Sequence, residues 1–113
     1  MKGEHLIVDL FGVAETQCKD IKLFIKLGRQ IADLLEATVI KTLSNRFVEP
    51  NPGVSVILAL NKSHISFHSI AKNRVVAVDV FCCSTEGIES SVLSILRDNI
   101  SYSDMRKWCI TRM

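Results

Sequence analysis

The feature of this 113-residue sequence that most constrains its fold is a block rich in Val and Ile between residues 52 and 84. Its alternation of apolar and polar residues predicts three short strands, separated by Asn61-Lys62 and by residues 71–74. The predicted strands are Val54–Leu60, Ser63–Ile70 and Val75–Cys83. Because the two connections are short, neighbouring strands must run antiparallel, and the block is predicted to form a three-stranded meander.

The lengths of the two turns also predict the register of this meander. A two-residue first turn sets Ser55 opposite His68, and counting through the second turn sets Ser63 opposite Cys82, beside Cys83. The polar residues therefore fall into two clusters. Five residues of strand, at about 3.3 Å each, separate the clusters by roughly 16 Å. If both clusters act at one site, a second copy of the chain is expected to bring them together.

The rest of the chain predicts helices and further strands around the meander. The predicted elements are a strand at Glu4–Phe11, a helix ending near Glu36, a strand at Thr38–Phe47, a loop at Glu49–Gly53, a helix at Glu86–Asn99 and an edge strand at 105–111. Thr16 or Asp20 is expected to cap the first helix, and Ser84 or Thr85 the second. Gly28 is expected to mark close packing against the sheet. The predicted fold is α+β, a two-layer sandwich of an antiparallel β-sheet covered by two helices.

Composition indicates one globular domain over residues 1–113, since 48% of residues are hydrophobic and 23% are charged. A net charge of +2 does not indicate a nucleic-acid or membrane partner. The sequence has no run of 18 apolar residues and no signal-peptide pattern, so a cytoplasmic protein is expected. The four cysteines are Cys18, Cys82, Cys83 and Cys109, and their spacing favours free thiols over a metal site or a disulfide framework.

Three segments carry a resemblance to a known family. Ser63-His64-Ile65-Ser66-Phe67-His68 is preceded by Gly53-Val54-Ser55 and followed by Val78-Asp79-Val80-Phe81-Cys82-Cys83. Together these segments resemble the core of the short prokaryotic S-adenosylmethionine decarboxylases. The opening His5-Leu6-Ile7-Val8-Asp9-Leu10-Phe11-Gly12 is similar to that family's first strand, so the resemblance extends from about residue 5 to 96.

The resemblance implies a self-cleaving lyase of polyamine biosynthesis, made as a zymogen and active as a dimer. The serine matching Ser63 becomes a covalent pyruvoyl cofactor when the chain is cleaved after the residue matching Lys62. The residues matching Ser55 and His68 assist cleavage, and the cysteine matching Cys83 donates the proton during decarboxylation. Each active site of the family lies between two protomers, which agrees with the separation of the two clusters. The implied substrate is a small amine, S-adenosylmethionine.

The chemistry explains why such residues are needed. A serine hydroxyl in a constrained turn, here that of Ser63, can attack the carbonyl of Lys62 and convert the amide into an ester. Elimination and hydrolysis then leave a pyruvoyl carbonyl, which forms a Schiff base with a substrate amine and accepts the electrons released with carbon dioxide. The resulting carbanion-like centre needs a proton, which the thiol of Cys83 can supply. The imidazole of His68 can move protons during cleavage.

Three positions depart from the family pattern and leave alternatives open. Lys62 stands where the family has a glutamate, and Lys72 replaces a glutamate that holds the ribose hydroxyls of the substrate. Phe47 lies two residues away from the position of the adenine-stacking phenylalanine. A lysine has only donors and cannot accept hydrogen bonds from ribose. The alternatives are a pyruvoyl decarboxylase of a basic amino acid, arginine or ornithine, and an uncleaved, non-catalytic regulatory or binding relative.

The sequence around the histidines, Cys82 and Asp79 indicates structural roles more than a specific chemical one. His5, His64 and His68 are assigned to separate strands or opposite faces, without a supporting carboxylate, so no metal site is expected. Cys82 points to the face opposite Cys83 and is assigned to packing. Asp79 lies within an apolar strand and requires a partner that the sequence does not identify.

Overall fold

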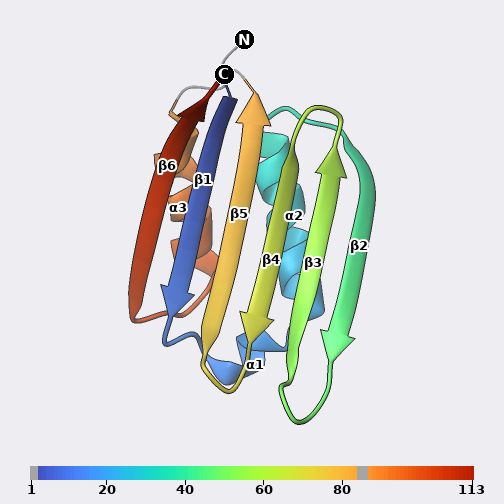
Figure 1. Cartoon of the computed structure of the whole chain (residues 1–113), viewed down its shortest axis with the longest axis vertical. Coiled ribbons are helices and arrows are strands. Elements are labelled where there is room, and N and C mark those ends of the chain that lie inside the picture. The colour runs from blue at the N-terminus through green and yellow to red at the C-terminus, as the bar shows by residue number, and fades with distance from the viewer. Residues whose placement is uncertain (1–2, 84–86) are drawn as a thin grey trace.

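The computed structural model describes residues 3–83 and 87–113, and its elements are traced in Figure 1. The strands are β1 (Gly3–Phe11), β2 (Val39–Phe47), β3 (Gly53–Leu60), β4 (His64–Ile70), β5 (Val75–Cys83) and β6 (Asp104–Arg112). The helices are α1 (Glu15–Cys18), α2 (Ile21–Leu34) and α3 (Ile88–Asn99). Within these ranges, no helix is long and apolar enough to cross a membrane.

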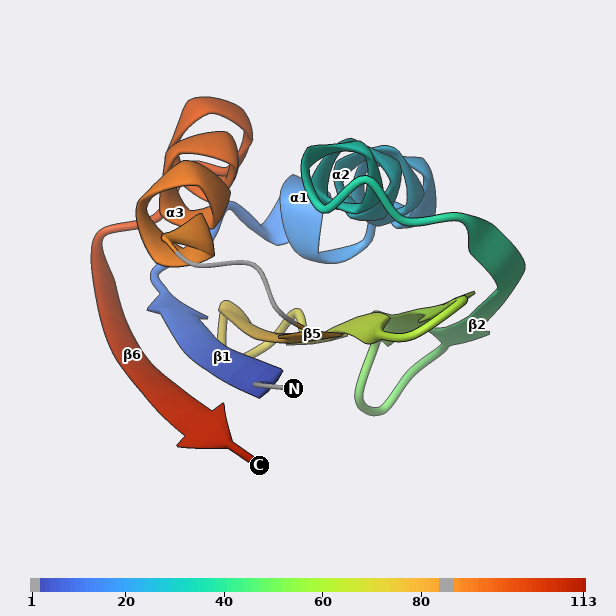
Figure 2. The same cartoon turned by 90° about the horizontal axis from the view of Figure 1, so that it is seen from above.

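The strands form one six-stranded antiparallel sheet in the order β2-β3-β4-β5-β1-β6. Figure 2 shows both long helices on one side of this sheet, with α2 over β3 and β4 and α3 near β1 and β6. The opposite side carries no helix of the described residues, and we call it the open face. The predicted α+β sandwich is therefore confirmed, including the edge strand near the C-terminus.

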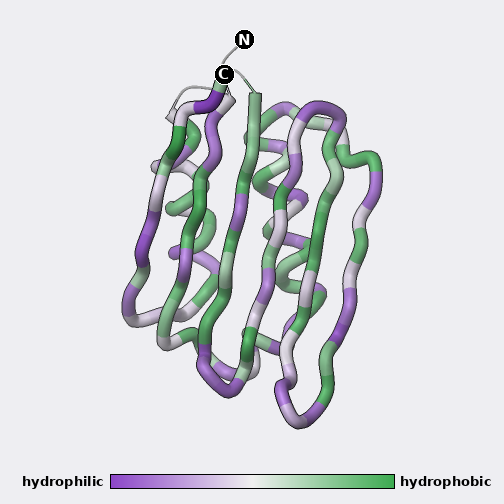
Figure 3. The backbone as a smooth tube through the Cα atoms, in the orientation of Figure 1, coloured by the Kyte–Doolittle hydropathy of each residue, from purple (hydrophilic) through white to green (hydrophobic). Residues whose placement is uncertain are grey.

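The register of the meander agrees with the sequence prediction. Ser55 pairs with His68 between β3 and β4, and Ile70 pairs with Val75 between β4 and β5. Figure 3 shows hydrophobic and hydrophilic residues alternating along several strands. Because successive side chains of a strand point to opposite faces, β4 directs Phe67 toward the helices and His68 toward the open face.

The core lies between the sheet and the two long helices. Phe24 of α2 stacks on Phe67 of β4 with ring centroids 5.3 Å apart, and both side chains are fully buried. Gly28 packs onto Leu58, since a Cβ at this glycine would lie 2.6 Å from the Leu58 Cδ1. The predicted close approach of α2 to the sheet at Gly28 is therefore confirmed.

Several helix details differ from the sequence prediction. Of the two predicted caps of the first helix, Asp20 is confirmed, since it caps α2 and its side chain accepts from the Leu23 amide at 3.1 Å. Thr16 lies instead inside the short helix α1, which was not predicted. Leu34, the last residue of α2, is 37% exposed. The N-cap of α3 is Gly87, with no side-chain capping bond. The predicted caps Ser84 and Thr85 and the predicted start at Glu86 lie outside the described residues.

Gly53 begins β3 where the backbone of β4 comes very close. A Cβ at this position would lie 2.1 Å from the carbonyl oxygen of Ser69, which is backbone and cannot rotate away. We expect Gly53→Ala to lower the free energy of unfolding by about 1–3 kcal/mol, as overpacking in a core does. Urea unfolding followed by circular dichroism measures this loss. An unchanged midpoint would contradict the close approach.

Candidate active site

The turn between β3 and β4, which contains Lys62 and Ser63, is held from two sides. The Leu60 amide donates to the Ser63 carbonyl at 3.0 Å, which closes the hairpin. Asn61 ties the same turn to the segment that follows α2. Its amide donates to the Thr38 carbonyl at 3.1 Å, and its side-chain oxygen accepts from the Thr38 amide at 3.2 Å. These bonds constrain the backbone around the Lys62-Ser63 peptide bond.

Cys83, at the end of β5, directly contacts this turn. Its Sγ donates a hydrogen bond to the Lys62 carbonyl oxygen at 3.3 Å. This is the carbonyl that the Ser63 hydroxyl would attack in a self-cleavage reaction. A hollow of about 180 Å³ surrounds the contact, and its lining residues are Leu35, Glu36, Ala37, Asn61, Lys62, Ser63 and Cys83. The structure thus brings together Lys62, Ser63 and Cys83, whereas Cys82 is buried in the core, as predicted.

The second predicted cluster, Ser55 with His68, is also present. The Ser55 Oγ and the His68 Nδ1 are hydrogen-bonded at 2.8 Å across β3 and β4. The Ser55 side chain is half-buried and the His68 side chain is exposed on the open face. An imidazole hydrogen-bonded to a hydroxyl can exchange a proton with it, so the pair is suited to acid–base work.

The two clusters do not meet within one chain. Ser63 directly precedes β4 and His68 lies on β4, five residues further along the chain. In an extended strand, five residues separate Ser63 from His68 by about 16 Å. Cys83, Ser55 and His68 nevertheless belong to the same open face of the sheet. A site that uses both clusters must therefore take them from two chains.

Two of the three residues that depart from the family pattern, Lys72 and Phe47, lie around the loop between β2 and β3. Lys72 follows β4 and forms an exposed ion pair with Glu49, with its Nζ 3.5 Å from the carboxylate. Phe47, at the end of β2, is 42% exposed. A hollow of about 440 Å³ adjoins them, lined by Lys19, Arg46, Phe47, Val48, Glu49, Pro52 and Gly53. The Glu49 carboxylate is a hydrogen-bond acceptor beside the lysine that lacks one.

One cluster was missed by the sequence interpretation. The side chains of His5 and Asp79 are hydrogen-bonded to each other. One potential metal-ligand atom from each of His5, His64 and Asp79 lies within 4.8 Å of the other two. The expectation that His5 and His64 are kept apart without a carboxylate is therefore wrong, while His68 is not part of this group. The cluster could have been found only from the order of the strands in the sheet. Pairing of β1 with β5 brings His5 close to Asp79, and nothing local in the sequence specifies that pairing.

All four cysteines are free thiols, and burial affects two of them most clearly. Desolvation raises the pKa of the Cys18 and Cys82 thiols above their ordinary value of 9.0, and the Glu4 carboxylate raises that of Cys82 further. Unfolding exposes both groups and returns each pKa to its ordinary range. The unfolded chain therefore loses these protons at a lower pH than the folded chain, which favours unfolding in alkali.

We expect the free energy of unfolding to be constant with respect to these thiols below about pH 8 and to fall as the pH rises through 9.0 and beyond. Urea unfolding between pH 7 and pH 10 measures this dependence. The double variant Cys18→Ala/Cys82→Ala is expected to be less stable overall but to show a shallower alkaline slope. Equal slopes in the two proteins would contradict the assignment.

Comparisons with known proteins identify the family to which the chain is similar. A sequence model of the S-adenosylmethionine decarboxylase family matches residues 4–113. The S-adenosylmethionine decarboxylase proenzyme of Clostridium botulinum (strain Loch Maree / Type A3) is 28% identical over 100 residues, which are 88% of this chain and 84% of that protein. The S-adenosylmethionine decarboxylase proenzyme 2 of Bacillus cereus is 32% identical over 102 residues, covering 86% and 80% of the two chains.

The fold is also that of a solved structure. The crystal structure of the adenosylmethionine decarboxylase from Aquifex aeolicus VF5 superimposes with a TM-score of 0.81. The match covers 96% of this chain and 88% of that chain, at 20% sequence identity. The family match over nearly the whole chain, together with these relatives, shows that this protein belongs to the S-adenosylmethionine decarboxylase family.

Proposed function

We propose that this chain, acting as a single domain, is a self-processing S-adenosylmethionine decarboxylase that is cleaved between Lys62 and Ser63. The observation that carries the proposal is the hydrogen bond from the Cys83 thiol to the Lys62 carbonyl. It puts a proton donor on the oxygen that gains negative charge when the Ser63 hydroxyl attacks the Lys62 carbonyl carbon. The four free thiols also fit a reducing compartment such as the cytoplasm.

The residues around the turn fit the formation of a pyruvoyl group from Ser63. The turn is fixed by hydrogen bonds on both sides, which limits the positions that the Ser63 hydroxyl can take relative to the Lys62 carbonyl. Bound at the new chain end, the pyruvoyl group would supply an electron sink for decarboxylation of an amine substrate. Cys83 already lies beside that chain end, where a thiol can deliver the single proton that decarboxylation requires.

We propose that a second copy of the chain covers the open face and completes the site. Six apolar side chains are exposed there, and they are Leu43, Phe47, Ile57, Ile70, Trp108 and Ile110. An uncovered apolar sheet face of this kind favours association. The separation of Ser55 and His68 from Ser63 supports another copy as the partner. A two-fold axis can place the His68 cluster of one protomer beside the Ser63 cluster of the other.

Complementation between two inactive variants tests this shared site. We expect His68→Ala alone to slow cleavage by about 10²–10⁴-fold, the usual contribution of a general acid–base group. Co-expressed with Ser63→Ala, about half of the His68→Ala chains would sit in mixed dimers that contain one intact site. Those chains are expected to be cleaved, as intact-protein mass spectrometry would show. Absence of rescue in mixed dimers that are shown to form would contradict a site shared between protomers.

The substrate is tested by carbon dioxide release from S-adenosylmethionine, arginine and ornithine, each offered to the processed protein. We expect S-adenosylmethionine to be decarboxylated with the highest kcat/KM. Lys72 motivates the alternative, because it matches the position of the family's glutamate that accepts from the ribose hydroxyls, has only donors itself, and is ion-paired with Glu49. Preference for arginine or ornithine would support that alternative. Processed protein that releases no carbon dioxide from any of the three would contradict the proposed activity.

A further inference from the structure

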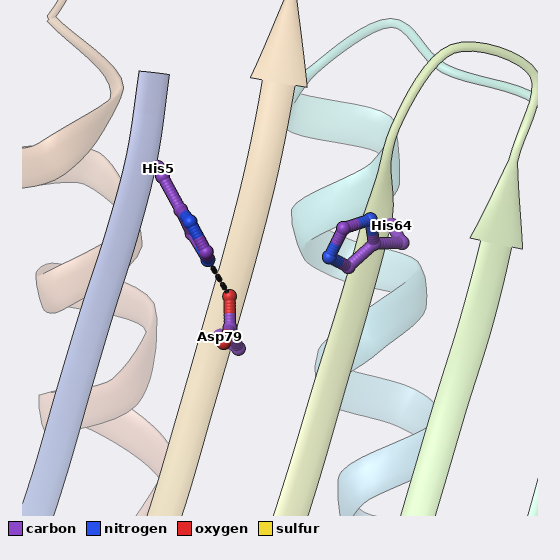
Figure 4. A group of neighbouring side chains, drawn as sticks. All are labelled: His5, His64 and Asp79. Carbon is purple, nitrogen blue, oxygen red and sulfur yellow. Dashed lines mark hydrogen bonds and ion pairs between the residues drawn. The ribbon is translucent and has the colours of Figure 1, made fainter. Parts of the chain in front are cut away.

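The cluster of His5, Asp79 and His64 has no role in the proposed decarboxylation. The three residues come from adjacent strands β1, β5 and β4 and lie on the open face. Figure 4 shows the His5 and His64 rings directed from either side toward the middle strand, which carries Asp79. We propose that these three side chains form a binding site for a divalent transition-metal ion of the Zn²⁺ type.

The geometry requires only a small adjustment. One ligand atom from each residue lies within 4.8 Å of the other two. In a tetrahedral zinc site, with bonds of about 2.0–2.1 Å, ligand atoms are about 3.3 Å apart. Rotation of the exposed His64 side chain can supply most of the approach, because His5 and Asp79 are already in contact. Metal binding would replace the His5–Asp79 hydrogen bond with two bonds to the ion.

The ligand atoms define the class of metal. Two imidazole nitrogens and one carboxylate oxygen suit Zn²⁺, Co²⁺ or Ni²⁺, whereas Mg²⁺ and Ca²⁺ prefer oxygen ligands throughout. Three protein ligands leave a fourth position for water or for a group of a covering partner. In the single chain the His5 side chain is 21% exposed and that of Asp79 is 37% exposed, so an ion can reach them before a second copy covers the open face.

The surroundings of the cluster combine an apolar ring with a positive charge. The Phe81 ring lies beside both histidines, with centroids 6.0 Å from His5 and 5.6 Å from His64. Such an apolar neighbour restricts the ring positions and strengthens nearby electrostatic interactions. The Arg112 guanidinium lies over the Phe81 ring, 5.0 Å from its centroid. This positive charge opposes cation binding, so the Asp79 carboxylate is required in addition to the two imidazoles.

The position of His64 gives such an ion a structural consequence. His64 is the first residue of β4 and directly follows Ser63. An ion held by His64, His5 and Asp79 would fasten the start of β4 to β1 and β5. This consequence for the chain end rests on the proposed cleavage at Ser63, whereas metal binding itself does not.

The experiment is a titration of the full-length Ser63→Ala protein with ZnCl2, followed by isothermal titration calorimetry with a non-chelating reductant present. Because Ser63→Ala cannot form the pyruvoyl group, the result is independent of cleavage. We expect one Zn²⁺ per chain, and at least about tenfold weaker binding after His64→Ala or the isosteric Asp79→Asn. His68→Ala is the matched control, since it removes an imidazole from the same strand and face and leaves all four thiols in place.

Each outcome of the titration decides the proposal. Unchanged affinity in His68→Ala, with loss in His64→Ala and Asp79→Asn, would support it. Tetrahedral Co²⁺ absorption that disappears in the same two variants would support it further. No zinc binding by the Ser63→Ala protein would overturn the proposal. So would equal affinity of His64→Ala and His68→Ala, because binding would then be due to thiols or other groups.

Discussion

Ser63→Ala is expected to abolish cleavage of the chain and, with it, all decarboxylation. The turn before β4 consists of Asn61, Lys62 and Ser63, and Ser63 carries its only hydroxyl. The substitution removes this hydroxyl, which is adjacent to the Lys62 carbonyl. Without that nucleophile, neither the ester nor the pyruvoyl group can form, so the effect is complete rather than partial. Intact-protein mass spectrometry under denaturing conditions measures the loss of the two fragments, and carbon dioxide release measures the loss of turnover.

The matched control for this variant is Ser66→Ala, which removes a hydroxyl from the open face of β4. It is expected to be cleaved as the unmodified chain is. Circular dichroism should show the same fold for both variants, since neither serine is in the buried core. Fragments of unchanged mass in the Ser63→Ala protein would contradict the role of this serine.

Cys83→Ala is expected to separate the two reactions. Its thiol is a weak hydrogen-bond donor to the Lys62 carbonyl, so we expect cleavage to slow by no more than about tenfold. Decarboxylation by the cleaved protein should fall by about 10²–10⁴-fold in kcat, because a general acid is lost. KM should change little if the thiol acts on the proton transfer rather than on binding.

Cys109→Ala provides the comparison for Cys83→Ala, because this thiol is exposed on β6 and distant in sequence from the turn. It should leave both cleavage and kcat near their unmodified values. The two variants must be compared at matched fractions of cleaved chain. Equal kcat values for the two variants would contradict proton donation by Cys83.

The meander was predictable because local rules determine it. The alternation of apolar and polar residues predicts its strands, and the lengths of the two short turns predict the register that pairs Ser55 with His68. The contact of Cys83 with the Lys62 carbonyl follows from the same counting, since Ser63 was predicted to lie opposite Cys82. Residues within one continuous hairpin system are thus located by loop length alone.

The errors lie where distant segments meet or where a chain direction changes. The insertion of β1 between β5 and β6 brings His5 to Asp79, 74 residues away, and no local pattern encodes this neighbour. The short helix α1 was not predicted, and the sequence left the cap of the long helix open between Thr16 and Asp20, because both are good capping residues. Of the two, only Asp20 has a side chain that accepts from a backbone amide, that of Leu23. Tertiary contacts decide such choices.

The measurement that tests the proposed function most directly is the intact mass of the purified, untagged chain under denaturing conditions. Self-cleavage predicts two species, one comprising residues 1–62 and the other residues 63–113, the second with a pyruvoyl group in place of its N-terminal serine. That carbonyl blocks Edman degradation of the second fragment and reacts with hydroxylamine. A single species with the mass of the uncut 113-residue chain would contradict self-processing and favour an uncleaved regulatory or binding relative.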